Sequence, residues 1–183
     1  MKSTVNALIF FLGLAVSGSA AANADPAALD SAQVSLAYQR YDEATTILNS
    51  ILARNPDNLD ALYLLLATRQ TRILDYEAYL IWGDDFLRTC DSVLCILEKA
   101  LPRQRSEDSV RCLFYIGNAY GGKSVVHAKN DRWIPAIKDA LTSTGLLRQV
   151  RKLDPLHYEA RLGTGAFKYY LSNDLRWVPG LGN

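Results

Sequence analysis

Apolar residues return every three or four positions along most of the chain, which is the spacing of amphipathic helices and not of strands. Short polar stretches containing Asn, Asp or Pro separate these segments. The pattern predicts an all-α protein, with helices over residues 29–38, 44–52, 59–72, 75–101, 112–120, 131–153 and 158–171.

Proline and glycine mark where these helices end or bend. Pro56 and Pro155 disfavour helical geometry at the residue before them, so we expect a helix to end at each. Pro135 is compatible with the helix over 131–153 because it falls in the first turn. Gly83 weakens a helix interior, so the long helix over 75–101 is predicted to bend or break near it.

A repeated phrase joins the second and fourth of these segments. Tyr41-Asp-Glu-Ala44 recurs in degraded form as Asp75-Tyr-Glu-Ala78, 34 positions further on. Together with Asn55-Pro-Asp57, Ile116-Gly-Asn-Ala-Tyr120 and Leu153-Asp-Pro155, the repeat resembles the tetratricopeptide signature over roughly residues 28–172. The later phrases are also similar to a group of exported bacterial tetratricopeptide proteins.

The resemblance implies a right-handed solenoid of helical hairpins with irregular repeats. Two departures from the family pattern make the repeats irregular: Cys90 stands where an exit proline would fall, and Ala136 precedes Pro155 by 19 positions where Ala44 precedes Pro56 by 12. The positions that would pack or terminate the repeats are Ala44, Ala78, Pro56, Gly117, Tyr120, Ala136 and Pro155.

The resemblance also implies a function. Tetratricopeptide-like repeats hold an extended or helical peptide on the concave face formed by the first helix of each pair. This predicts a non-catalytic scaffold that binds a protein or peptide and needs no cofactor. Registering the repeats places on that face Tyr63, Gln70, Arg111, Asn118, Leu162 and Tyr169.

The first 24 residues differ from the rest. They contain Lys2, no acidic residue, an apolar run over 7–16 and the sequence Ala22-Asn-Ala24, which together predict a secretory signal peptide cleaved after Ala24. The apolar run is shorter than the roughly 20 residues needed to cross a bilayer, so we expect no membrane span after cleavage and a periplasmic or secreted protein. An N-terminal core helix is the alternative.

The charge balance excludes a strong electrostatic pull toward nucleic acid. Lys and Arg total 20 against 19 Asp and Glu, a formal net charge of +1. Cys90, Cys95 and Cys112 are either small buried residues or partners in a disulfide, and their spacing is not that of a zinc site. Asp84, Asp85 and Asp91 fit a solvated helix face better than a metal site.

One motif argues for an enzyme. Residues 117–124, Gly-Asn-Ala-Tyr-Gly-Gly-Lys-Ser, match the phosphate-loop pattern, in which Lys123 and Ser124 would contact phosphate and Mg²⁺. Such a loop stands on a parallel sheet, and the chain has no series of Val- and Ile-rich strands to build one. We interpret the match as accidental, with a nucleotide-binding enzyme as the alternative.

The end of the chain is apolar and rich in turn residues. Residues 25–172 make up the predicted repeat domain, and residues 173–183 follow it without another predicted helix. Stacked repeats expose an apolar face unless a capping helix covers it. Two explanations stay open: the chain is part of a longer protein, or this edge contacts another subunit, which would make the protein a permanent component of an envelope complex.

Overall fold

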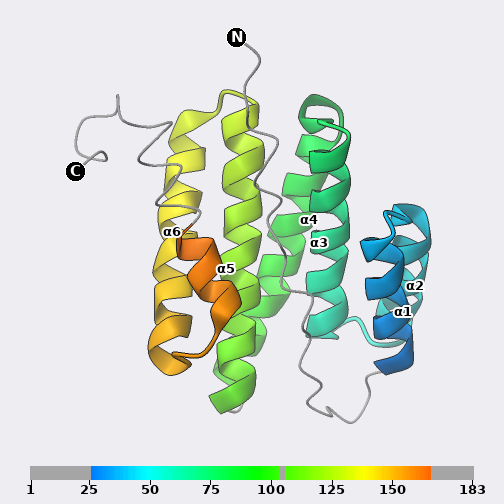
Figure 1. The fold of residues 1–183 in the computed structure, drawn as a ribbon, viewed down its shortest axis with the longest axis horizontal. Coiled ribbons are helices and arrows are strands. Elements are labelled where there is room, and N and C mark those ends of the chain that lie inside the picture. The colour runs from blue at the N-terminus through cyan, green and yellow to red at the C-terminus, as the bar shows by residue number, and fades with distance from the viewer. Residues whose placement is uncertain (1–25, 104–105, 166–183) are drawn as a thin grey trace.

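The computed structural model describes residues 26–103 and 106–165 (Figure 1). Its elements in chain order are α1 (Pro26–Ala37), α2 (Tyr41–Arg54), α3 (Leu59–Asp75), α4 (Tyr79–Ala100), the 3-10 helix η2 (Leu101–Arg103), α5 (Ser106–Lys129) and α6 (Trp133–Leu153). A further helical segment covers residues 158–165. The described residues contain helices and turns and no strand, which confirms the all-α prediction.

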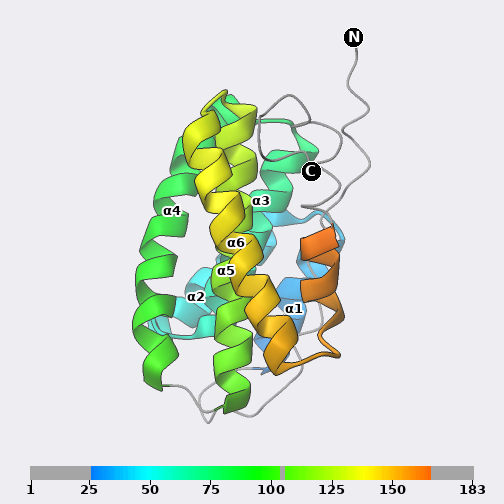
Figure 2. The same ribbon diagram turned by 90° about the vertical axis from the view of Figure 1, so that its left-hand side faces the viewer.

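The long helices form three antiparallel pairs: α1 with α2, α3 with α4, and α5 with α6 (Figure 1). The first helices of the pairs also contact one another, α1 against α3 and α3 against α5. The segment 158–165 crosses α5 and α6 on one side of the molecule (Figures 1 and 2). The first helices therefore lie next to each other, and the pairs follow one another in chain order.

The turns inside the three pairs have the same backbone geometry. One residue in each has a positive φ, and these are Gln39 at 59°, Glu77 at 50° and Asp131 at 59°. The next amide closes the turn with a hydrogen bond five residues back: Arg40 N to Ser35 O at 2.8 Å, Ala78 N to Ile73 O at 3.0 Å, and Arg132 N to His127 O at 2.8 Å. The three pairs therefore share a common internal turn.

This equivalence corrects the predicted repeat register. The turn residues Gln39 and Glu77 are 38 positions apart, and the third turn residue, Asp131, follows Glu77 by 54 positions. Ala44 lies fully buried inside α2, whereas Ala78 is the residue that precedes α4. The 34-residue match fails as a structural alignment because α3 has 17 residues where α1 has 12, which moves the second turn along the chain.

The predicted break near Gly83 is wrong. Helix α3 continues to Asp75, the chain turns at residues 76–78, and α4 then runs unbroken through Gly83. A Cβ atom at Gly83 would lie 3.0 Å from both a Val126 methyl group and the Asn130 amide nitrogen on the α5 side. The glycine permits this close approach of two helices.

The other predicted boundaries agree more closely. Asn58 caps α3 by accepting a hydrogen bond from the Ala61 N–H at 3.0 Å. Helix α6 ends at Leu153 and holds Pro135 in its first turn. Pro56 and Pro155 are exposed and lie in the turns that follow α2 and α6. Several sequence predictions concern residues that the structure does not describe: the signal peptide over 1–24, Tyr169 and the tail over 173–183.

Two small residues predicted to pack the pairs lie at helix contacts. Gly117 is buried in α5, where an added Cβ would lie 3.1 Å from a Leu147 methyl group on α6. Ala136 is also buried on α6, and Tyr120 is partly buried against the main core. That core joins α3, α4, α5 and α6, and a smaller cluster joins α1, α2 and α3.

All three cysteines are free thiols. Cys90 and Cys112 are buried in the main core and Cys95 is exposed. Burial raises the pKa of the Cys112 thiol to about 11, and its Sγ donates to the Leu97 carbonyl at 3.3 Å. The two buried thiols therefore act as small apolar residues. Among the described residues, no helix combines the length and apolarity needed to cross a membrane.

Candidate functional site

The predicted groove residues do not form one open face. Tyr63 is only 4% exposed and Gln70 is also buried, while Arg111 and Asn118 are partly buried. Leu162 is exposed on the segment 158–165. Tyr63 and Gln70 are enclosed because α3 contacts α1, α2, α4 and α5. Two of the predicted residues, Tyr63 and Arg111, do belong to one connected group.

We call this group the first-helix cluster. It contains residues from α3, from α5 and from the chain after α6, namely Asp60, Tyr63, Asp108, Arg111, Tyr115, His157 and Glu159. All of these elements except the segment around residue 157 are first helices of their pairs. The cluster therefore brings together residues nearly 100 positions apart in the sequence.

Two stacked tyrosines connect α3 to α5. The rings of Tyr63 and Tyr115 are nearly parallel, at 8°, with centroids 4.1 Å apart. The Tyr115 hydroxyl donates to Asp60 Oδ1 at 2.7 Å. Arg111 lies beside the same carboxylate, with Nη1 3.6 Å from Asp60 Oδ2, and its Nη2 donates to Asp108 at 2.8 Å. The two helices are thus connected by both ring packing and polar contacts.

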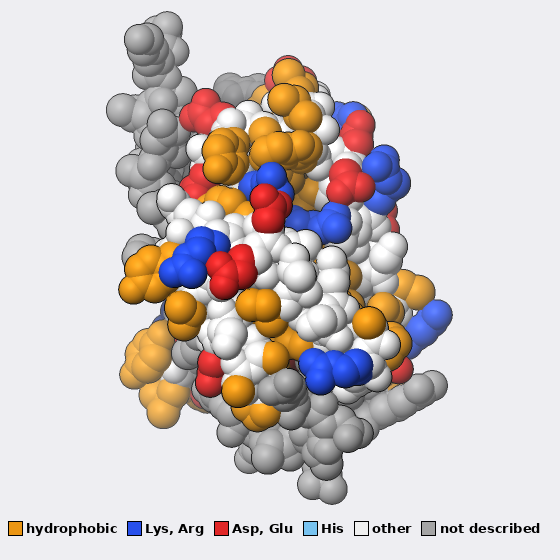
Figure 3. Space-filling model, turned by 90° about the vertical axis from the view of Figure 1, so that its right-hand side faces the viewer, with side chains coloured by type: hydrophobic (Ala, Val, Ile, Leu, Met, Phe, Trp, Pro, Cys, Tyr) orange, Lys and Arg blue, Asp and Glu red, His pale blue; other side chains and the backbone are white. Residues whose placement is uncertain are grey.

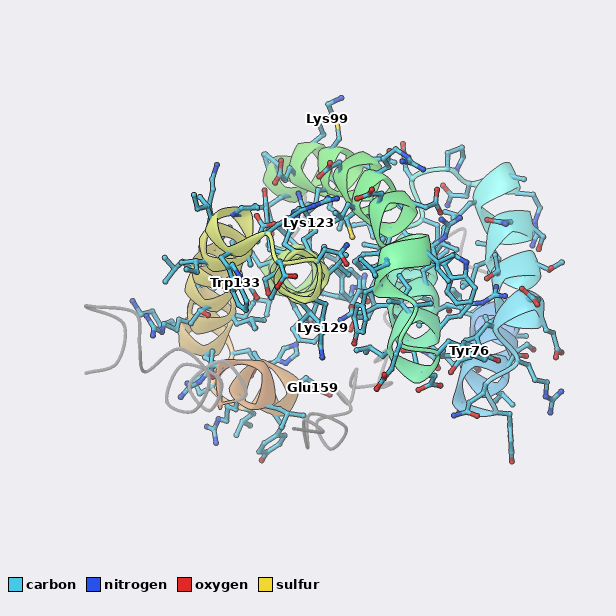
Figure 4. The ribbon with its side chains drawn as sticks, turned by 90° about the horizontal axis from the view of Figure 1, so that it is seen from above. Tyr76, Lys99, Lys123, Lys129, Trp133 and Glu159 are labelled. Carbon is cyan, nitrogen blue, oxygen red and sulfur yellow. The ribbon has the colours of Figure 1, made fainter. Side chains whose placement is uncertain are left out.

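The third side of the cluster comes from residues after α6. The His157 ring lies 4.5 Å from the Phe114 ring, centroid to centroid. Glu159, labelled in Figure 4, projects from the segment that faces α5. Its Oε2 lies 3.1 Å from His157 Nδ1, although the two are not oriented for a hydrogen bond.

The cluster has more negative than positive charge. Asp60, Asp108 and Glu159 supply three carboxylates against the single guanidinium of Arg111. Burial raises the pKa of the Tyr115 hydroxyl, and the Asp60 carboxylate raises it further. Burial likewise raises the pKa of Tyr63, with a second contribution from Glu159. Both tyrosines are therefore neutral hydrogen-bond donors.

Two polar atoms of the cluster are buried without a hydrogen bond to any described residue. They are the Tyr63 hydroxyl and His157 Nδ1. A buried polar group left without a partner costs about 1–3 kcal/mol, so such groups are rare in folded proteins. The cluster has unused hydrogen-bonding capacity beside an excess of carboxylates, which suits a ligand that supplies a positively charged donor and an acceptor.

The residues that match the phosphate-loop pattern do not form a loop. Residues 117–124 lie wholly inside α5, where backbone N–H groups are taken up by the helix and cannot surround a phosphate. Lys123 pairs with Asp91 on α4, with Nζ 2.6 Å from Oδ1, and Ser124 donates to the Gly121 carbonyl at 2.7 Å. Gly122 allows close helix packing, because a Cβ there would lie 2.8 Å from Gln70 Oε1.

The other aspartates of α4 are also paired with cations. Asp84 accepts from Arg132 at 2.8 Å, and Asp85 accepts from Arg69 at 2.7 Å. These pairs connect α4 to the turn before α6 and to α3. Among the described residues, no group of three or more His, Cys, Asp or Glu side chains is arranged to hold a metal ion.

A shallow cavity of about 400 Å³ lies between α4 and α5. Its lining contains Asp91, Leu94, Cys95, Glu98, Lys99, Tyr120 and Lys123. Lys99 and Lys123, which both line this cavity, are labelled in Figure 4 and lie near α4. Lys123 is bound to Asp91, and the Tyr120 hydroxyl donates to Glu98 at 3.1 Å. No buried polar atom of this lining lacks a hydrogen bond, so among the described residues the cavity is a weaker candidate site than the first-helix cluster.

Sequence reasoning missed five members of the cluster: Asp60, Asp108, Tyr115, His157 and Glu159. Asp108 precedes Arg111 by three positions on the same helix. Tyr115 follows Arg111 by four positions, which places both on one face of a helix and could have indicated it. The other three join the cluster only through tertiary packing.

Comparisons with family models, with curated proteins and with solved structures gave no match. The molecule is thus defined by its own geometry as an all-α protein of paired helices with a polar cluster on its first helices.

Proposed function

We propose that the protein is a non-catalytic scaffold of the bacterial cell envelope, built from tetratricopeptide-like repeats, that binds a protein or peptide at the first-helix cluster. The observation that carries the proposal is the cluster itself, with its excess of carboxylates and two buried polar atoms that form no hydrogen bond with the described residues. The three equivalent turns and the contacts between first helices support the repeat interpretation. The N-terminal sequence pattern supports export.

The charge of the cluster indicates the kind of group that it binds. A positively charged Lys, Arg or N-terminal amine of a peptide would lie among three carboxylates, where charge-assisted hydrogen bonds are stronger than neutral ones. An acceptor on the same peptide, such as a backbone carbonyl, would accept a hydrogen bond from the Tyr63 hydroxyl. Both kinds of contact require the cluster to open by a small movement, because Tyr63 is enclosed.

Co-purification from envelope extract tests this function. We expect the unaltered protein to retain a defined partner, and two isosteric variants, Tyr63→Phe and Asp60→Asn, to retain at least about tenfold less of it. That loss corresponds to about 1.4 kcal/mol, which is within the range for one hydrogen bond. The matched control is Asp84→Asn, which changes an exposed carboxylate outside the cluster. Partner recovery is measured by quantitative mass spectrometry, and melting temperatures confirm that the variants are folded.

Equal recovery by all four proteins would contradict the proposal. Recovery of a partner that depends instead on Leu156 or Leu162 would favour a second function, a permanent subunit of an envelope complex. The observation that favours this second function is the set of exposed apolar side chains at the end of α6 and after it, namely Leu153, Leu156, Tyr158 and Leu162. Loss of the partner on Leu162→Ser with no loss on Asp60→Asn would identify that edge as the interface.

A further inference from the structure

Three positions just after the equivalent turns are unusually apolar. The second and third residues of α4 are Leu80 and Ile81, which are 87% and 77% exposed, and the second residue of α6 is Ile134, which is 85% exposed. At the same two positions of α2, the chain has Asp42 and Glu43. The common turn geometry makes these positions directly comparable.

The acidic residues of α2 are what helix physics favours there. The first turn of a helix has unpaired N–H groups and a partial positive charge, so carboxylates stabilise it. Helices α4 and α6 have no acidic residue in the first turn. Leu80, Ile81 and Ile134 forgo that stabilisation and expose apolar surface to water. Neither core packing nor the charge preference of the helix end accounts for them.

These residues occupy the same end of the molecule. The α3–α4 and α5–α6 turns both lie at the upper end in Figure 1, and hydrophobic side chains gather at that end in Figure 3. Tyr76 and Trp133, which belong to the two turns, are exposed to solvent and stand well apart when this end is seen from above in Figure 4. We call this surface the hairpin tips, comprising Tyr76, Leu80, Ile81, Trp133 and Ile134.

We propose that the hairpin tips dock on a lipid surface. A stable protein interface takes about 20–30 residues from each partner, far more than the tips provide. Two separate convex turns would also require two matching hollows on a rigid partner, whereas a fluid lipid surface needs no such match. Tyr and Trp suit the boundary between headgroups and acyl chains, where one end of the side chain stays wet.

The charge of the chain specifies the kind of lipid surface. The formal net charge is +1, which is too small to attract an anionic membrane strongly. Attachment by aliphatic side chains follows buried apolar area, so it should occur on neutral lipids and change little with salt. The proposal does not depend on the function of the first-helix cluster.

Vesicle flotation tests the docking. The full chain is mixed with vesicles of pure phosphatidylcholine, and the bound fraction is compared with that of a double variant, Leu80→Asp with Ile81→Glu. These are the residues that α2 carries at the same positions, so the variant should fold with an unchanged or higher melting temperature. We expect its lipid partition coefficient to fall at least about tenfold, the effect of removing roughly two buried methylene groups. The matched control is Leu156→Asp, an exposed apolar residue in the turn that follows α6, whose end lies at the lower side of Figure 1.

The contact itself is measured with an environment-sensitive fluorescent amino acid placed at position 134 or, as control, at position 42. We expect a blue shift and quenching by brominated lipids at position 134 and neither at position 42. Equal lipid binding by the double variant and the unaltered chain would overturn the proposal. So would binding that appears only with added phosphatidylglycerol, or a loss of self-association in the double variant with no change in flotation.

Discussion

Replacing Tyr63 by Ala is expected to lower the free energy of unfolding by about 3–5 kcal/mol, the range for removing a buried aromatic ring. The ring is almost fully buried, stacks on Tyr115 and lies 5.9 Å from the Phe114 ring, so its loss leaves a cavity between α3 and α5. Tyr63→Phe keeps every ring contact and removes only a hydroxyl that has no partner among the described residues. We therefore expect Tyr63→Phe to be neutral or stabilising.

Urea denaturation of the two variants beside the unaltered protein measures both effects. The pair is informative because the proposed function gives the same hydroxyl a role in binding. A Tyr63→Phe protein that is as stable as the original and binds its partner less tightly would separate function from folding. A loss below about 1 kcal/mol for Tyr63→Ala would instead mean that the α3–α5 contact is open in solution.

Phe86→Ala should have an effect of similar size. Phe86 is 1% exposed and belongs to the core that joins α3, α4, α5 and α6. A Cβ atom at Gly122 would lie 3.0 Å from the Phe86 Cζ, which shows how closely α5 approaches it. We expect Phe86→Ala to cost about 3–5 kcal/mol, because the surrounding helices cannot collapse fully into the space left by the ring.

Ile81→Ala is the matched control for Phe86→Ala, since it truncates an apolar residue of the same helix that is exposed. Its effect should stay within about 0.5 kcal/mol. The same thermal or urea denaturation measures both variants. Comparable losses for the two would mean that α4 is rotated about its axis relative to the arrangement described above.

Sequence periodicity predicted the helices that have clear ends. Helix α6 and the start of α3 were located because Pro135, Pro56 and Asn58 impose definite local geometry. The boundary between α3 and α4 was predicted at residues 73–74, before the observed turn at residues 76–78. That turn contains neither glycine nor proline, and Glu77 adopts a positive φ that its residue type does not favour. There, tertiary packing of α4 on α3 decides the geometry.

The candidate site was only partly predictable for a related reason. Tyr63 was expected on an open face, yet residues 61–68 of α3 are buried in succession. The uninterrupted apolar run from Ala61 to Ala67 could have predicted this burial, because a helix that is apolar on all sides is a buried one. Arg111 was expected on the same open face, and the structure places it beside Asp60 of α3, a contact that only the packing of α3 on α5 creates.

The central structural claim is that α5 is one unbroken helix, so that residues 117–124 pack against α4 and α6 and form no phosphate loop. Backbone NMR chemical shifts and amide exchange along this helix test the claim most directly. We expect helical shifts and protected amides from Cys112 through Val126, unchanged when ATP and Mg²⁺ are added. Loop-like shifts with fast-exchanging amides at Gly117–Gly122, and a response to nucleotide, would contradict it.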